Sequence, residues 1–200
     1  MKYQTSYDQN ESLPNKKGLV DKVAIENEEM EGLLKASILL TEKLNARTNF
    51  NLKYIQQMHS MAFGDLYDFA GRWRSVNLSK GGFVFAAAQF LNQTMYAFEE
   101  QMLKNMLKKY DSKEAFIKDV AKIHAEFLFI HPFREGNGRT ARLLTDLMYR
   151  KHKFAPPRWE MISKDENLPL NFGLYIRAVQ QASNQEYTVM QEIFRQISQS

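Results

Sequence analysis

Residues 131–142 read His-Pro-Phe-Arg-Glu-Gly-Asn-Gly-Arg-Thr-Ala-Arg, and this stretch decides how the rest of the chain is interpreted. Within it, Gly136, Asn137 and Gly138 predict a tight turn that opens a helix. The first backbone N–H groups of such a helix have no acceptor within the helix, so they favour an anion. Glycine also lets a phosphate approach the backbone without a Cβ atom in the way. The stretch therefore predicts an anion site at a helix start.

The side chains around this turn add chemistry to the predicted anion site. Arg139 and Arg142 are three residues apart, on one side of the helix start, where guanidinium groups can hold phosphate oxygens. Glu135 would repel a phosphate unless a cation lay between them, which is a role that Mg²⁺ fills. His131 is a titratable base at the end of the preceding helix. A base, a metal ligand and a phosphate cradle within twelve residues favour phosphoryl-group chemistry.

The helix before the motif has the clearest pattern in the chain. Asp111 and Glu114 predict its start as a capping-box-like pair. Its buried face then recurs at helical spacing, through Phe116, Val120, His124 and Phe127. We interpret His124 as a buried core residue, and His59 and His152 as surface or structural residues.

The rest of the chain predicts an all-α domain with one small β-hairpin. Further helices are expected over 21–44, 52–62, 87–108, 139–149, 170–182 and 185–197. The first has an apolar stripe made of Val23, Met30, Leu33, Leu34, Ile38 and Leu44. The hairpin is expected where 75–79 and 83–85 flank Lys80-Gly81-Gly82. We expect residues 1–18 to be a flexible lead-in and residues 19–200 to form a single domain.

Composition excludes several classes of protein. Among 200 residues, 27 Lys and Arg against 23 Asp and Glu leave a net charge of 27 − 23 = +4, and no zinc finger or basic tail indicates nucleic-acid binding. The absence of cysteine excludes disulfides and thiolate metal sites. No apolar run indicates a membrane helix, and the polar N-terminal residues do not look like a secretory signal. We therefore expect a cytoplasmic protein that binds neither a membrane nor nucleic acid.

The segment HPFREGNGRTAR resembles the signature of the Fic family, H-x-F-x-[D/E]-G-N-G-R-x-x-R, at every defined position. Upstream, FGDLYDFAGRWR and NLSKGGFVF also look like the family core, so the resemblance covers residues 50–182. It implies a Fic-type helical bundle with a hairpin called the flap, preceded by an inhibitory helix over 19–46 and followed by a C-terminal helix over 183–200. The implied activity is protein adenylyltransferase, which moves AMP from ATP to a Ser, Thr or Tyr hydroxyl and releases pyrophosphate.

The resemblance also implies roles for single residues. His131 would deprotonate the target hydroxyl, and Glu135 would bind Mg²⁺ at the phosphates of ATP. Phe133 would pack the loop into the core. The anion hole, the arginines on the distal phosphates and a residue near the adenine would be Gly136, Asn137, Gly138, Arg139, Arg142 and Tyr175.

Two further features follow from the same resemblance. Gly138 favours AMP transfer over the kinase-like branch, which has a lysine there that fills part of the anion hole; the choice of ATP over other nucleotides rests on weaker grounds. The flap would hold the target protein by main-chain pairing, as in β-augmentation. It would be formed by Lys80, Gly81, Gly82, Phe83, Val84 and Phe85.

The first helix resembles the inhibitory helix that many Fic proteins carry, [S/T]-x-x-x-E-[G/N]. Here Asn27 stands for Ser or Thr, and Glu31 and Gly32 follow. Glu31 would then pair with Arg142 and block productive ATP binding. A glycine inside a helix costs about 1 kcal/mol relative to alanine, so Gly32 itself indicates a close approach. A rival brake, residues 188–192, lacks the glycine or asparagine.

Two alternatives to a self-inhibited enzyme stay open. One is a nucleotide-binding regulator with little turnover, and the other is a Fic-type toxin controlled by a separate antitoxin. The expected partners are accordingly a protein target docked at the flap, which could be the protein itself, a second copy of the chain, or an antitoxin.

Overall fold

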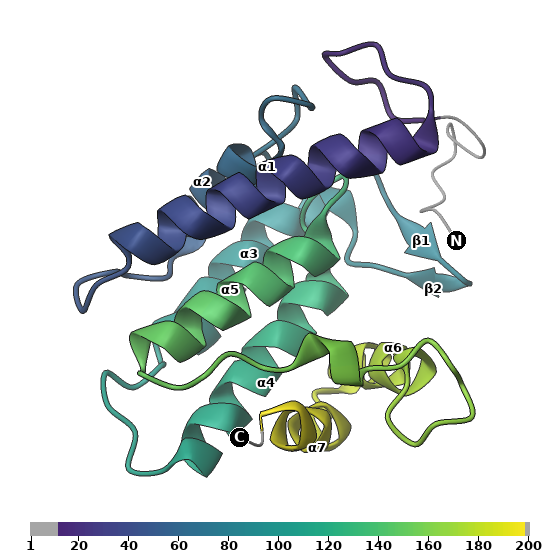
Figure 1. The fold of residues 1–200 in the computed structure, drawn as a ribbon. Coiled ribbons are helices and arrows are strands. Elements are labelled where there is room, and N and C mark those ends of the chain that lie inside the picture. The colour runs from purple at the N-terminus through teal and green to yellow at the C-terminus, as the bar shows by residue number, and fades with distance from the viewer. Residues whose placement is uncertain (1–11, 199–200) are drawn as a thin grey trace. The chain divides into compact units, whose positions relative to one another are not determined.

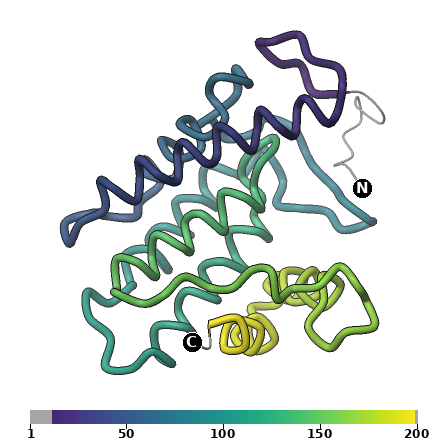
Figure 2. Tube along the Cα trace, viewed as in Figure 1, coloured from purple at the N-terminus to yellow at the C-terminus, as the bar shows by residue number. Residues whose placement is uncertain are grey.

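The computed structural model describes residues 12–198, which contain seven α-helices and one antiparallel hairpin (Figures 1 and 2). This confirms the all-α fold class with a small hairpin. The described residues form two compact units, one from residues up to 97 with 130–140, the other from 98–129 with residues from 141 onward. The elements are α1 (Lys22–Lys43), α2 (Leu52–Phe63), β1 (Ser79–Lys80), β2 (Phe83–Val84), α3 (Leu91–Phe98), α4 (Lys113–Ile130), α5 (Asn137–Lys151), α6 (Phe172–Gln181) and α7 (Thr188–Ile197).

In the first unit, α1 lies along α2. Both helices start at side-chain caps: Asp21 accepts from Ala24 N–H at 2.9 Å, and Asn51 accepts from Tyr54 N–H at 2.8 Å. The two helices approach closely at Gly32, where an added Cβ would lie 2.2 Å from the carbonyl oxygen of Ala62. Gly32 therefore has a packing reason for being glycine.

The prediction of an apolar stripe on the first helix is wrong. Val23, Met30, Leu34 and Ile38 are exposed, and the buried face of α1 consists of Ile25, Glu29, Ala36 and Leu40. Glu29 and Ala36 lie between Ile25 and Leu40 on this face, around the close approach to α2 at Gly32. At 22 residues α1 is the longest helix described, and neither it nor any other helix within 12–198 combines the length and the apolar character that crossing a membrane requires.

The lead-in of residues 1–18 was expected to be flexible, and its first eleven residues lie outside the described part. Residues 12–18 are held by specific contacts. Lys16 N–H donates to the Leu66 carbonyl at 2.9 Å, and the Asn15 side chain accepts from Leu19 N–H at 2.9 Å. The chain is therefore fixed before α1 begins.

The helix expected over 87–108 is broken into three pieces. A 3₁₀ turn, Ala88–Phe90, leads into α3, and a π-helical turn, Glu99–Leu103, follows it. Phe98 and Leu103 are both buried although they are five residues apart. A turn with i→i+5 bonds brings residues at this spacing to one face, and the Lys104 N–H to Glu99 bond has that spacing.

In the second unit, α4 packs against α5 and α7. The rings of Phe116 and Tyr149 lie 4.8 Å apart, and those of His124 and Phe194 lie 5.1 Å apart. Helix α4 starts at Lys113 and is capped by Ser112, whose hydroxyl accepts from Ala115 N–H at 3.1 Å, so the expected cap at Asp111 is one residue early. Helices α6 and α7 also contact each other.

Candidate active site

The end of α4 places His131 in an unusual backbone conformation. Helix α4 ends at Ile130, and His131 follows with φ +56°, in the left-handed region. A left-handed residue just after a helix is usually glycine, and a proline often comes next, as Pro132 does here. A residue with a Cβ atom costs about 1–2 kcal/mol in this conformation. The strained residue, His131, is the one that the sequence predicts to be the base.

Gly136 and Gly138 are glycines for different reasons. Gly136 has φ +75°, and an added Cβ would lie 2.7 Å from the ring of Phe63. Gly138 lies in the first turn of α5, and an added Cβ there would meet nothing within 4 Å. The fold therefore requires Gly136, whereas the space beside Gly138 is open.

Asn137 closes the loop with its side chain. Its Oδ1 accepts from Phe133 N–H at 2.8 Å, and its Nδ2 donates to the Phe133 carbonyl at 2.8 Å. Helix α5 begins here: Thr140 N–H donates to the Gly136 carbonyl at 2.9 Å. The backbone N–H groups of residues 137–139 precede that first bond, so by helix geometry they have no acceptor within α5. Asn137 can thus contribute its backbone, but not its side chain, to an anion site.

Glu135 lies at the start of this cradle. Its Oε1 accepts from Gly136 N–H at 2.8 Å and lies 3.5 Å from Nη2 of Arg139. Burial raises the pKa of Glu135, and the nearby Glu29 raises it further, while the Gly136 N–H and Arg139 act in the opposite direction. Its side chain keeps 27% of its exposure, so the carboxylate can still reach a bound cation.

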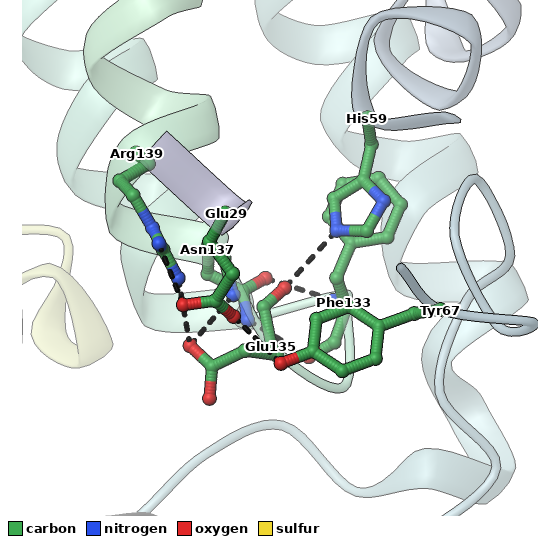
Figure 3. Close-up of polar contacts among 8 residues, drawn as sticks. Glu29, His59, Tyr67, Phe133, Glu135, Asn137 and Arg139 are labelled. Carbon is green, nitrogen blue, oxygen red and sulfur yellow. Dashed lines mark hydrogen bonds and ion pairs between the residues drawn. The ribbon is translucent and has the colours of Figure 1, made fainter. Parts of the chain in front are cut away.

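Arg139 is held by a carboxylate from α1. Its Nη1 lies 2.9 Å from Oε2 of Glu29, which is buried and also accepts from the Tyr67 hydroxyl at 2.8 Å (Figure 3). The guanidinium lies 5.1 Å from the ring centre of Phe63. Burial opposes the charge on Arg139, but Glu29 outweighs it and the pKa of Arg139 is raised. In this structure the first motif arginine is therefore already paired.

Glu31 has a different partner from the one the sequence analysis expected. It pairs with Lys35 at 2.6 Å on the outer side of α1, and its side chain is 58% exposed. Asn27 is exposed as well. The carboxylate of α1 that reaches the motif is Glu29, two residues earlier, and its partner is Arg139.

His131 and the flap meet in the same unit. The imidazole of His131 stacks on the ring of Phe85, with 3.9 Å between the ring centres and 22° between the planes. The hairpin pairs Ser79 with Val84 and Lys80 with Phe83. Both turn glycines have positive φ, which suits a two-residue hairpin turn. The expected hairpin is confirmed, with shorter strands.

His59, interpreted from the sequence as a surface or structural residue, is a structural one whose partners the sequence did not indicate. It is buried; its Nδ1 accepts from Gly71 N–H at 2.9 Å, so Nε2 holds the proton and donates to the Glu135 carbonyl at 3.0 Å. Its ring stacks on Phe133, 3.7 Å between centres, which fixes the fully buried Phe133 as expected. Burial lowers the pKa of His59 to about 4. A neutral histidine thus fixes the loop of residues 131–138 through its bond to Glu135 and its stacking on Phe133. No local sequence pattern around His59 indicates this role.

The remaining predicted residues lie in the second unit. The guanidinium of Arg142 is 5.4 Å from the ring centre of Trp159. Tyr175 is buried, and its hydroxyl bonds to Nε2 of His124 at 2.6 Å, while Nδ1 of His124 bonds to Thr145 at 2.8 Å. Burial raises the pKa of Tyr175 to about 12. His124 is a core residue, as expected, and Tyr175 packs with it.

Curated relatives are similar to part of this chain. A probable protein adenylyltransferase, y4lH from Sinorhizobium fredii, is 32% identical over 103 residues, which cover 51% of this chain and 54% of the relative. Protein adenylyltransferase VbhT from Bartonella schoenbuchensis is 33% identical over 94 residues, covering 46% of this chain and 20% of the relative. The chain thus spans about half or less of these relatives' length.

Solved structures share the fold over almost the whole chain. The Fic domain of the Bep8 effector from Bartonella sp. 1-1C has a TM-score of 0.76 at 18% identity and covers 98% of this chain and 94% of its own. BepC from Bartonella tribocorum, solved with bound AMPPNP, has a TM-score of 0.72 at 18% identity and covers 97% and 96%.

The family assignment rests on the core of the chain. The sequence model of the Fic/DOC family matches residues 49–149, just over half of the 200 residues. This range contains α2, the hairpin, α4 and the whole loop from His131 to the first turns of α5. The chain belongs to the Fic/DOC family.

Proposed function

We propose that the protein transfers AMP from ATP to a hydroxyl side chain of a protein. The observation that carries the proposal is the pairing of a strained base with an open anion cradle: His131 sits at φ +56°, and the first turn of α5 follows six residues later with open space at Gly138. The names of the relatives, protein adenylyltransferases, and the AMPPNP bound to BepC support it.

The transfer divides between His131 and the start of α5. The neutral imidazole of His131 takes the proton of the target hydroxyl as that oxygen attacks the α-phosphorus of ATP. The bond from the α-phosphorus to the bridging oxygen breaks, and pyrophosphate leaves with the bonding electrons. The backbone N–H groups of residues 137–139 stabilise the charge on the phosphate oxygens. The target segment would pair with the hairpin, where the side chain of Val84 is exposed.

Glu135 fits a magnesium ion that reaches the site with ATP. Within residues 12–198 there is no group of three His, Asp or Glu side chains that could form a metal cage. Mg²⁺ bound with nucleotides is typically held by one or two carboxylates, phosphate oxygens and water. Glu135 would provide the carboxylate, and the ion would supply charge neutralisation at the phosphates.

The main experiment is mass spectrometry of the protein incubated with ATP and Mg²⁺. We expect a mass gain of one AMP per modified hydroxyl, on the protein itself or on an added target. The His131→Ala variant should show no gain, while His152→Ala, outside the motif, should label as the wild type does. Labelling that persists in the His131→Ala variant would refute the proposal.

Self-inhibition by Glu31 is the regulatory part of this proposal. Because Glu31 pairs with Lys35 in the structure, the brake requires Glu31 to exchange Lys35 for Arg142. We expect Glu31→Gly to raise the rate of self-labelling, with Glu26→Gly as the control for losing an exposed glutamate from the same helix. An equal rate in the two variants would show that Glu31 is not the brake.

One observation favours a second candidate, a nucleotide-binding regulator with little turnover. Arg139, which would hold a phosphate, is occupied by the buried Glu29. The Glu29→Gln variant keeps the side-chain shape and removes the charge. A regulator would bind ATP in this variant and still label nothing, even with Glu31→Gly added. An enzyme restrained by its own helix would label faster. A toxin held by an antitoxin would label only after that partner is removed.

A further inference from the structure

Arg74 is a buried arginine whose side chain donates to four main-chain carbonyls. Its Nε donates to the His131 carbonyl at 2.7 Å, and its Nη2 donates to the Ile130 carbonyl at 3.2 Å. On the other side, Nη1 donates to Val76 at 2.6 Å, and Nη2 also donates to Ala86. One guanidinium thus joins the end of α4 to both ends of the hairpin segment, within a single compact unit.

The contacts to Ile130 and His131 cap a helix. The last carbonyls of a helix have no intrahelical donor, and a cation near them is stabilised by the helix dipole. Helix α4 ends at Ile130, and the guanidinium lies against its last carbonyls. The backbone N–H of Arg74 adds a bond to the Pro132 carbonyl at 2.8 Å. Three successive residues, 130–132, are therefore tied to this one arginine.

Stability alone is a poor explanation for this arrangement. A buried charge is expensive unless it is well hydrogen-bonded, and the bonds to α4 use only part of the guanidinium, because Nη1 and Nη2 also bond to Val76 and Ala86. Burial lowers the pKa of Arg74 to about 10, yet the group stays charged at neutral pH. The rigid fork of five N–H donors on three nitrogens lets one side chain reach several carbonyls, whereas the three donors of a lysine all lie on one nitrogen.

The arginine also determines where the imidazole lies. The strained φ of His131 persists only while its surroundings hold it, and the Arg74 bond acts on the carbonyl of that same residue. The imidazole stacks on Phe85, and the next residue, Ala86, accepts from Arg74. Both rings of the stacked pair are therefore placed by residues bonded to one guanidinium.

We infer that Arg74 is a positioning residue for the transfer: it locks the base and the flap into one unit, so that a hydroxyl held by the flap lies at a set distance from the imidazole. The inference rests on the proposed function. Arg74 touches neither substrate nor phosphate in this scheme and acts only through His131 and Phe85.

The test compares Arg74→Lys with Arg72→Lys by self-labelling with ATP. Arg72 is an exposed arginine two residues earlier, and its side chain donates to the Asp68 carbonyl. We expect Arg74→Lys to lower kcat by about 10- to 100-fold, as misplacement by an ångström does, with the KM for ATP kept within about twofold. The acidic limb of the kcat–pH profile should also move. Arg72→Lys should change neither.

Each other outcome has a defined meaning. If Arg74→Lys unfolds more easily but keeps kcat and the pH profile, the arginine is only structural and the inference is overturned.

If Arg74→Lys does not fold, Phe85→Leu replaces it: a fall in kcat with unchanged KM for ATP supports the inference, and an unchanged kcat overturns it. If the wild type labels nothing, the proposed function itself has failed; if it labels and Arg74→Lys equals Arg72→Lys, only the inference has failed.

Discussion

At the scale of single residues, Gly136 and Gly138 predict different effects of substitution: one on stability, the other on ligand binding. Gly138→Ala adds a methyl group into open space on a helix, so the free energy of unfolding should stay the same or rise by up to about 1 kcal/mol. The same methyl group occupies the space where a phosphate would lie, so AMP transfer should fall. Urea denaturation and labelling measured on one preparation check both.

Gly136→Ala is the matched variant. It forces a residue with a Cβ atom into φ +75° and toward the Phe63 ring at 2.7 Å, so we expect a loss of about 1–3 kcal/mol in the free energy of unfolding. If Gly138→Ala were as destabilising as Gly136→Ala, the prediction that only Gly136 is required for folding would be wrong.

The buried His59 predicts how stability changes with pH. Its pKa is about 4 in the folded protein, against 6.5 for an unperturbed histidine. Between these values the unfolded chain binds a proton that the folded chain does not, so the stability is fully present above pH 6.5 and is lost as pH falls toward 4. The loss is about 1.4 kcal/mol per pH unit and about 3 kcal/mol in all.

The control for this prediction is His59→Gln, since an amide can also donate to Glu135 and accept from Gly71. His124, whose pKa burial lowers to about 3, adds a loss of the same sign, so the informative quantity is the difference between the two proteins. The unfolding free energy of the variant should fall less steeply between pH 6.5 and 4. Parallel curves would mean that His59 is not the titrating group.

The turn at Gly136 and the helix start after it could be predicted from the sequence because both are local features. The proposed roles of His131, Glu135 and Gly136 follow from residue types that lie within a few positions of one another. His59 and Arg74 could not be assigned, since they act on carbonyls about 57 to 76 positions away. Glu29 was also missed, because an acidic residue on a buried face looks like part of a solvated helix until its partners Tyr67 and Arg139 are known.

At the scale of helices, the crossing of α1 and α2 predicts a reversed effect at Gly32. Glycine to alanine within a helix ordinarily stabilises by up to about 1 kcal/mol. Here the added Cβ would lie 2.2 Å from the Ala62 carbonyl, which belongs to the backbone and cannot turn away. Gly32→Ala should therefore lower the free energy of unfolding by about 1–3 kcal/mol. Leu34→Ala, an exposed site on the same helix, should be near neutral in thermal or urea unfolding.

Helix positions were predictable where burial follows a simple repeat. Phe116, Val120 and Phe127 lie on the buried face of α4 as their spacing indicates. The same reasoning failed for helix α1, because most of the residues in its predicted apolar stripe are exposed and its buried face also holds Glu29 and Ala36. The interruption after α3 was also unforeseen, since the five-residue step from Phe98 to Leu103 looks like ordinary helical variation.

At the scale of the whole molecule, MgATP should stabilise the folded protein. A ligand that binds only the folded state adds about 2.7 kcal/mol at a concentration a hundred times its Kd, which for 200 residues raises Tm by about 5–10 °C. Calorimetry with ATP, with and without Mg²⁺, measures this. Glu135→Gln should lose the part of the shift that depends on Mg²⁺, and Mg²⁺ alone should change nothing. A full shift in Glu135→Gln would remove the cation from the proposed site.

The fold class could be predicted because helix periodicity and one long signature agree over the same residues. The signature fixes the loop between α4 and α5, and the periodicity supplies the helices around it. What could not be predicted is how α1 presents its polar residues, because close helix packing at Gly32 decides which side faces inward.

The contrast between Gly136 and Gly138 has a consequence over evolutionary time. Replacing Gly136 lowers stability through both its positive φ and the contact with Phe63, so selection for a folded protein acts on this position. At position 138 an added side chain would meet open space, so only selection for ligand binding acts on this position. In a lineage where the activity is no longer under selection, Gly138 should therefore be replaced before Gly136. A relative that keeps Gly136 but has lost Gly138 would be a protein that still folds and no longer needs the ligand.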